Sequence, residues 1–166
     1  MLDRKLLGIY LNDHLAGSTV GMELSRRALG SNKGNAYGDV LERIAREIEE
    51  DRETLKGLMS RLGVKHDRAK VAAGWMAEKF GRLKPNGRLL SYSPLSRLVE
   101  LESLALGIAG KASLWETLKE VAAEDSRLDA EELGRLADRA ERQRKEVWQL
   151  RQRAAHEAFT DGVRSS

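Results

Sequence analysis

The sequence predicts an all-α fold: a single domain, residues 1–166, folded as a four-helix bundle. Aromatic residues make up only 5% of the chain and there are two prolines, a composition that favours helix over strand. Four long segments repeat apolar residues at helical spacing. The connections between these segments are short, long and short, which predicts two antiparallel hairpins joined by a crossover.

The first hairpin is predicted from two segments, residues 4–29 and 37–62. The first of them ends before the breaker-rich stretch "GSNKGNAYG". The second ends at Gly63, a residue type common just after a helix. Its apolar stripe alternates by three and four residues and has one polar member, Asp51; it comprises Leu41, Ile44, Ile48, Asp51, Leu55, Leu58 and Leu62.

The second hairpin is predicted from residues 94–123 and 130–159. Ser93 is suited to cap the third segment, with Pro94 in the first helical position. Its stripe consists of Leu98, Leu101, Ala105, Ile108, Ala112, Trp115 and Leu118. The fourth segment begins at "LDAEEL", where Asp129 would cap, Glu132 would close a capping box, and Leu128 could pack on Leu133.

Between the hairpins, residues 64–94 form a long connection with a predicted short helix over 67–82. The connection also contains the turn signal "KPNG". Small residues occur within two of the long helices, and they predict places where another helix approaches closely, within or between chains. These residues are Ala16, Gly17, Ser18, Gly21, Gly107 and Gly110.

The segment "LERIAREIEEDRETLKGLMSRLG" resembles the second helix of ferritin-like proteins, an acidic helix followed by a crossover. The resemblance covers most of the chain as an architecture and implies ferritin-like connectivity. The di-iron members of that superfamily bind metal through Glu-x-x-His motifs. No Asp or Glu in this chain has a histidine three residues later. No di-iron site is therefore expected, and the cofactor stays unknown.

His14 and Asp51 are predicted to face each other across the first hairpin. If the helices end near 29 and begin near 37, His14 lies opposite about residue 52. A buried carboxylate needs a partner, so a hydrogen bond or ion pair between the two is expected, with the histidine keeping its proton to higher pH. The pair would either fix helix register or act as a base and its orienting group.

The second hairpin is expected to place Lys111 opposite Glu141, with Glu100 on the same side as Lys111. Either Gln143 or Arg144 interrupts the apolar stripe of 130–159. Long charged side chains at the edge of a stripe usually keep their charged ends in water. A degenerate carboxylate site is the alternative, formed by His14, Glu47 and Asp51 with Glu100 or Glu102.

Charge is segregated along the chain. Residues 64–97 contain eight Lys or Arg and two acidic residues, whereas residues 98–134 contain three basic and nine acidic residues. Four basic residues surround the predicted start of the third long helix and are candidates for binding an anion: Arg82, Lys84, Arg88 and Arg97. The alternative is a solvated basic loop.

Zero cysteines exclude disulfides, thiol catalysis and thiolate metal sites, and no apolar run is long enough to span a membrane. A cytoplasmic protein is expected. The first functional hypothesis is a non-catalytic bundle that acts through self-association, as a homo-oligomer, or through a protein partner. The second is a metal-binding protein or oxidoreductase with the degenerate site, and the third is binding of phosphate or nucleic acid through residues 64–97.

Overall fold

The computed structural model describes residues 2–67 and 92–160. Four long helices account for most of them: α1 (Arg4–Ser31), α2 (Gly38–Leu62), α4 (Pro94–Glu120) and α5 (Ala130–Thr160), with a short 3-10 helix, η1 (Ala122–Glu124), after α4. All four long helices were predicted within three residues of their observed ends. The short helix expected over 67–82 lies, except for Asp67, outside the described residues.

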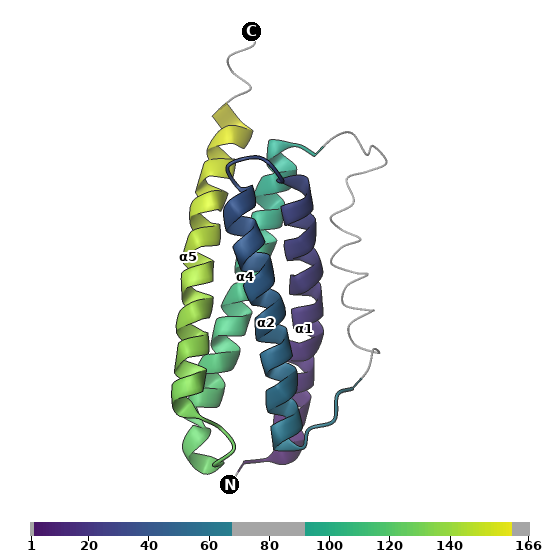
Figure 1. Cartoon of the computed structure of the whole chain (residues 1–166), viewed down its shortest axis with the longest axis vertical. Helices are drawn as coiled ribbons and strands as arrows, with labels where there is room; N and C mark the ends of the chain where they lie inside the picture. Colours follow the sequence, from purple (N-terminus) through teal and green to yellow (C-terminus); the bar gives the residue numbers. More distant parts are fainter. Residues whose placement is uncertain (1, 68–91, 161–166) are drawn as a thin grey trace.

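The helices run in the order up, down, down, up (Figure 1). The α1–α2 loop lies at one end of the bundle and the α4–α5 connection at the other. The helix α2 ends at the end of the bundle opposite to the one where α4 begins. This is the predicted arrangement of two antiparallel hairpins joined by one crossover, and it confirms the four-helix-bundle prediction.

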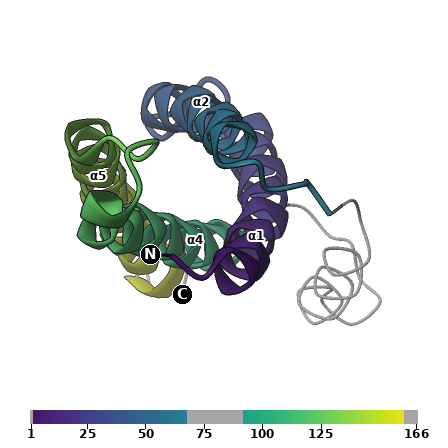
Figure 2. The ribbon, with the colours of Figure 1, turned by 90° about the horizontal axis from the view of Figure 1, so that it is seen from below.

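Seen along its axis, the bundle has the ring order α2, α1, α4, α5 (Figure 2). The helix α1 packs against α2 and α4, and α4 packs against α5. The seven stripe positions of α2 are buried, including Asp51. The predicted stripe of α4 is buried except for Ala112, which is half-buried. Apolar stripes with helical period therefore face one common core, as predicted.

The helix ends follow the predicted capping residues. The Ser93 hydroxyl accepts a hydrogen bond from the Ser96 N–H (3.1 Å), and Asp129 accepts from the N–H groups of Glu131 (2.9 Å) and Glu132 (3.1 Å). Gly63 ends α2 in the left-handed conformation, with φ of 70°. The Glu132 side chain is paired with Arg61 at 2.9 Å, which takes the place of the capping-box contact predicted for it.

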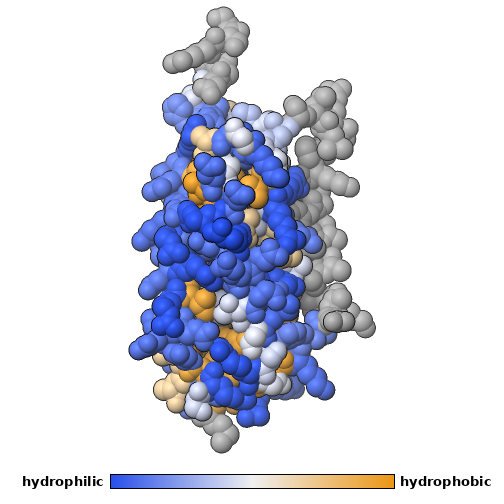
Figure 3. Space-filling view, in the orientation of Figure 1, coloured by the Kyte–Doolittle hydropathy of each residue, from blue (hydrophilic) through white to orange (hydrophobic). Residues whose placement is uncertain are grey.

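Long charged side chains connect α2 to α5, whose backbones stand farther apart than those of the other neighbouring helices. Arg43 pairs with Glu146, and Arg139 reaches Glu50 at 3.3 Å. The face that these two helices present is predominantly hydrophilic, with apolar side chains visible only in small patches (Figure 3). None of the described helices combines the length and apolarity needed to cross a bilayer.

Candidate functional site

A groove of about 710 Å³ lies between α1, α4 and the inner side of α2. Its walls are mostly apolar or small residues, and its polar lining comes from Asp13, His14, Ser18, Asp51, Arg52, Ser103 and Lys111. The apolar and small part of the lining consists of Gly17, Val20, Gly21, Leu24, Ile48, Leu55, Leu104, Leu106, Gly107, Ile108, Gly110, Leu114 and Trp115.

Four glycines form this groove by leaving space. A Cβ atom added to Gly17, Gly21, Gly107 or Gly110 would meet no side chain or neighbouring backbone of the described residues within 4 Å. None of the described helices approaches these four glycines closely, so the predicted close contact with another helix is not seen within residues 2–67 and 92–160. Larger side chains at these positions would fill the groove, so its depth depends on the glycines.

At the floor of the groove, Asp51 joins three helices. Its carboxylate accepts one hydrogen bond from the Lys111 ammonium of α4 and another from the Arg139 guanidinium of α5. Gln143 of α5, which is fully buried, accepts a hydrogen bond from Lys111 through Oε1 (2.5 Å) and donates one through Nε2 to Glu47 (2.8 Å). Asp51, Gln143 and Lys111 thus each have at least one hydrogen-bond partner, as buried polar groups require, while the buried Nε of Arg139 has none among the described residues.

Opposing effects act on the ionisable groups of this floor. Burial lowers the pKa of Lys111, and the neighbouring Asp51 carboxylate works against that shift. The pKa of Glu47 is also lowered: burial would raise it, but the hydrogen bond from Gln143 and the charges of Arg43 and Arg142 outweigh burial. The floor therefore keeps charged groups beneath an apolar groove by pairing them.

The predicted pairing of His14 with Asp51 is wrong. Both residues line the groove, but Asp51 is bound by Lys111 and Arg139. The His14 ring packs edge-on against Tyr10, with ring centroids 4.6 Å apart. Burial lowers the pKa of His14, and the nearby Asp13 only partly opposes this, so the expected upward shift is also wrong. The reason is that the Asp51 side chain points toward the second hairpin and not toward the other helix of its own hairpin.

Lys111 and Glu141 are also not partners. Lys111 reaches inward to Asp51 and Gln143, while Glu141, predicted as a buried polar residue, is half-exposed and pairs with Arg144 at 2.7 Å within α5. The true partner on α5, Gln143, is two residues farther along the helix. Gln143 is one of the two stripe-breaking residues noted in the sequence.

Glu100 and Glu102 lie apart from this floor. Glu100 is buried where α4 begins, and it pairs with Arg27 at 2.7 Å and accepts a hydrogen bond from the Tyr92 hydroxyl at 2.9 Å. Glu102 pairs with Arg151 of α5 at 2.8 Å. The degenerate carboxylate site predicted from His14, Glu47, Asp51 and one of these two glutamates is therefore not assembled. Among the described residues, no three His, Asp or Glu side chains are grouped so as to hold a metal ion.

Arg97, predicted to bind an anion, is held by the protein itself. Its Nε donates to Asn32 Oδ1 (2.7 Å), its Nη1 donates to Glu157 (2.9 Å), and its guanidinium lies over the Tyr37 ring. These contacts join the α1–α2 loop to α4 and α5. The other three predicted anion-binding residues, Arg82, Lys84 and Arg88, lie outside the described residues.

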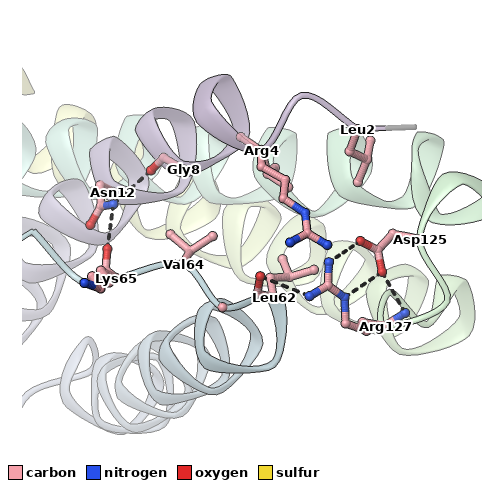
Figure 4. A pocket seen from close by; sticks show the side chains of 11 residues that line it. Leu2, Arg4, Gly8, Asn12, Leu62, Val64, Lys65, Asp125 and Arg127 are labelled. Atoms are coloured by element: carbon pink, nitrogen blue, oxygen red, sulfur yellow. Dashed lines mark hydrogen bonds and ion pairs between the residues drawn. The ribbon is translucent and has the colours of Figure 1, made fainter.

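A second cavity, of about 340 Å³, lies at the opposite end, where the start of α1 meets the end of α2 and the α4–α5 connection (Figure 4). Its polar residues bind one another. Asn12 donates to the carbonyl groups of Gly8 (2.9 Å) and Lys65 (3.1 Å). Arg127 binds Asp125 and the Leu62 carbonyl (3.1 Å), and Arg127 is the main reason that the pKa of Asp125 is lowered to about 2.

Sequence reasoning missed Arg52, Arg139 and Gln143 as members of the site. Gln143 could have been recognised from the sequence, because a polar residue in an apolar stripe is expected to have a buried partner. Arg52 and Arg139 could not have been recognised in this way, since each is one of many arginines on a highly charged helix. No protein-family model matches the chain, and comparisons with curated proteins and with solved structures find no significant match.

Proposed function

We propose that this chain is a binding protein and not an enzyme, and that it holds an apolar small molecule in the groove between α1 and α4. The observation that carries the proposal is the groove, with its volume of about 710 Å³ and its wall of aliphatic residues and glycines. Small-molecule sites typically enclose about 300–1,000 Å³, are mostly apolar, and contain a few convergent polar groups.

The pairing at the floor supports binding over catalysis. A general base or a nucleophile acts through a free lone pair close to the substrate. Both carboxylate oxygens of Asp51 are taken by cations, and the Lys111 ammonium is held by Asp51 and Gln143. These groups are arranged to anchor helices and to offer hydrogen bonds.

The proposal is tested with phenylnaphthylamine, a neutral apolar dye that fluoresces on entering apolar sites. Gly17→Leu and Gly107→Leu place a side chain in the groove from α1 and from α4, and leucine favours helix more than glycine does. We expect saturable binding by the unaltered chain and a loss of affinity of at least about tenfold in either variant.

The matched control is Gly57→Leu, at an exposed glycine of α2 where an added Cβ atom would also meet none of the described residues, but which does not line the groove. It is expected to bind the dye as the unaltered chain does. The proposal is overturned if the unaltered chain shows no saturable binding, or if filling the groove leaves the affinity unchanged while circular dichroism shows the same helix content.

Self-association through the same face is a second candidate function, and one observation favours it. Leu106 is 76% exposed beside Gly107 and close to Gly110, so an apolar side chain stands next to a flat stretch of α4. Sedimentation equilibrium tests this candidate. A dimer that Leu106→Glu converts to a monomer would support it, and a monomer at all concentrations would exclude it. Membership of the ferritin-like superfamily and nucleic-acid binding through residues 64–97 stay predictions.

A further inference from the structure

This inference rests on the proposed binding groove and concerns the chemical class of its ligand. We infer that the ligand is an apolar molecule with a carboxylate at one end, and that Lys111 and Arg52 hold this carboxylate at the floor of the groove. Both side chains line the groove, one from α4 and the other from α2.

The Lys111 ammonium has one N–H donor without a partner among the described residues. An ammonium group carries three N–H donors and no acceptor. Two of these donors reach Asp51 and Gln143, and no further acceptor is present among the described residues. Because the Lys111 side chain is only 15% exposed and borders the groove, its third donor is best satisfied by an oxygen atom of a bound molecule.

Arg52 is incompletely bound in a similar way. Its Nη1 donates to Glu53 (3.2 Å) and its Nη2 to the Thr19 hydroxyl (3.5 Å), which is at the limit of a hydrogen bond. Its Nε is buried with no acceptor in the described part of the chain. Arginine recognises carboxylates through two parallel hydrogen bonds, and its weak present contacts leave the guanidinium able to turn toward one.

The charge of the groove favours an anion over a cation. The Asp51 carboxylate is shared by Lys111 and Arg139 and is therefore already neutralised. Burial lowers the pKa of His14, so this ring is neutral at neutral pH. Asp13, the other acidic residue of the lining, is exposed to solvent, where its charge is screened. Arg52, with 22% of its side chain exposed, is paired with Glu53 at 3.2 Å, an exposed carboxylate that Lys56 shares, so the positive charge of Arg52 close to the floor is only partly compensated.

The test compares lauric acid, lauryl alcohol and lauryl amine as competitors of bound phenylnaphthylamine. These molecules share one apolar chain and differ in their head groups. We expect the acid to displace the dye at concentrations at least about tenfold lower than the alcohol, and the amine to be the weakest competitor. Equal displacement by acid and alcohol, or stronger displacement by the amine, would overturn the inference.

Two variants assign the effect to the named residues. Arg52→Met and Lys111→Met should each remove most of the preference for the acid, so that the acid and the alcohol displace the dye at similar concentrations. Lys111→Met leaves Asp51 paired with Arg139, and Arg52→Met changes a residue outside the Asp51 cluster, so loss of folding in the first variant leaves the second informative. The control is Arg46→Met, which removes a 68% exposed charge from α2 away from the groove.

The same assay separates this inference from the proposed function. If the dye binds in the groove but the head group has no effect, only the carboxylate assignment fails. If the dye does not bind, the proposed function fails as well. Stronger displacement by lauryl phosphate than by lauric acid would also overturn the carboxylate assignment, in favour of a phosphate head group.

Discussion

Asp51 connects the two hairpins at a single buried carboxylate. Its partners, Lys111 and Arg139, come from the second hairpin, whereas Asp51 belongs to the first. Removing one member of a buried ion pair leaves an uncompensated charge and is strongly destabilising, whereas removing a pair together is often nearly neutral. We therefore expect the complete Asp51 cluster to add little net stability, although loss of one of its members alone should be costly.

Replacing Asp51 with leucine is expected to lower the free energy of unfolding by about 3 kcal/mol, because Lys111 and Arg139 both lose their central partner. Urea unfolding measures the change. Adding Lys111→Met to this variant should recover a substantial part of the loss. Adding His14→Leu instead should recover none, and recovery with the histidine change alone would show that His14 is the true partner.

The sequence predicted which residues of this site are buried and polar, but not how they pair. The stripe of α2 singled out Asp51, and a polar residue there required a partner. His14 was predicted as the partner because only contacts within one hairpin could be inferred from the sequence. The residues of a hairpin's two helices that face each other follow from where those helices end and begin. How two hairpins dock depends on the side-chain volumes along the whole interface. The lysine, arginine and glutamine that bind Asp51 could therefore not be chosen from spacing.

At the scale of the element, two glycines of α2 and its C-terminal cap have opposite roles. Gly63 adopts φ of 70° at the end of the helix, where its N–H donates to the Ser60 carbonyl at 3.1 Å. Gly57 lies within the helix and is exposed, and an added Cβ atom would meet no atom of the described part of the chain within 4 Å. Only the first conformation requires glycine, because residues with a Cβ atom rarely adopt positive φ.

Gly63→Ala is expected to destabilise the protein by about 1 kcal/mol, the cost of forcing a residue with a Cβ atom into the left-handed region. Gly57→Ala should stabilise it by about 0.5–1 kcal/mol through helix propensity. Thermal or urea unfolding of the two variants shows whether each substitution raises or lowers the free energy of unfolding. Two changes of the same sign would contradict the assigned helix end.

The helices themselves were predictable because their signals are local. Apolar periodicity, the caps at Ser93 and Asp129 and the glycine at 63 act within a few residues of one another. The openness of α1 near Gly17 and of α4 near Gly107 was not predictable in the same way. Glycines in a helix permit either a close neighbour or an empty groove, and only the packing of the whole bundle decides between them.

At the scale of the whole molecule, one end of the bundle is held together by a polar network. Asn32 in the α1–α2 loop donates to the Tyr92 hydroxyl (2.8 Å), and this hydroxyl donates in turn to Glu100 of α4 (2.9 Å). Burial, together with the nearby Glu100 carboxylate, raises the pKa of Tyr92 to about 12. The two hairpins are therefore joined here by a phenol that must stay protonated.

This network predicts how stability depends on alkaline pH. The folded state holds the Tyr92 proton more tightly than the unfolded state, whose tyrosine pKa is about 10. The stabilisation is therefore fully present below about pH 10 and is lost as the pH rises toward about 12.

Comparing the unaltered chain with Tyr92→Phe by urea unfolding at several pH values isolates this contribution. Near neutral pH the variant should be less stable by about 1 kcal/mol, because it lacks the hydrogen bonds of the hydroxyl group. Above about pH 10 the difference should shrink. A difference that does not change with pH would mean that the Tyr92 proton is not held more tightly in the folded state.

The order of helices around the bundle has an electrostatic consequence. The ring order is α2, α1, α4, α5, and the directions are up, down, down, up along the chain, so every helix runs antiparallel to both of its neighbours. The two parallel pairs, α2 with α4 and α1 with α5, lie on the diagonals of the bundle. Each helix carries a macrodipole of roughly half an elementary charge at either terminus. Two positive and two negative termini therefore meet at each end of the bundle, so the aligned peptide groups largely cancel there and the local field is set by side chains.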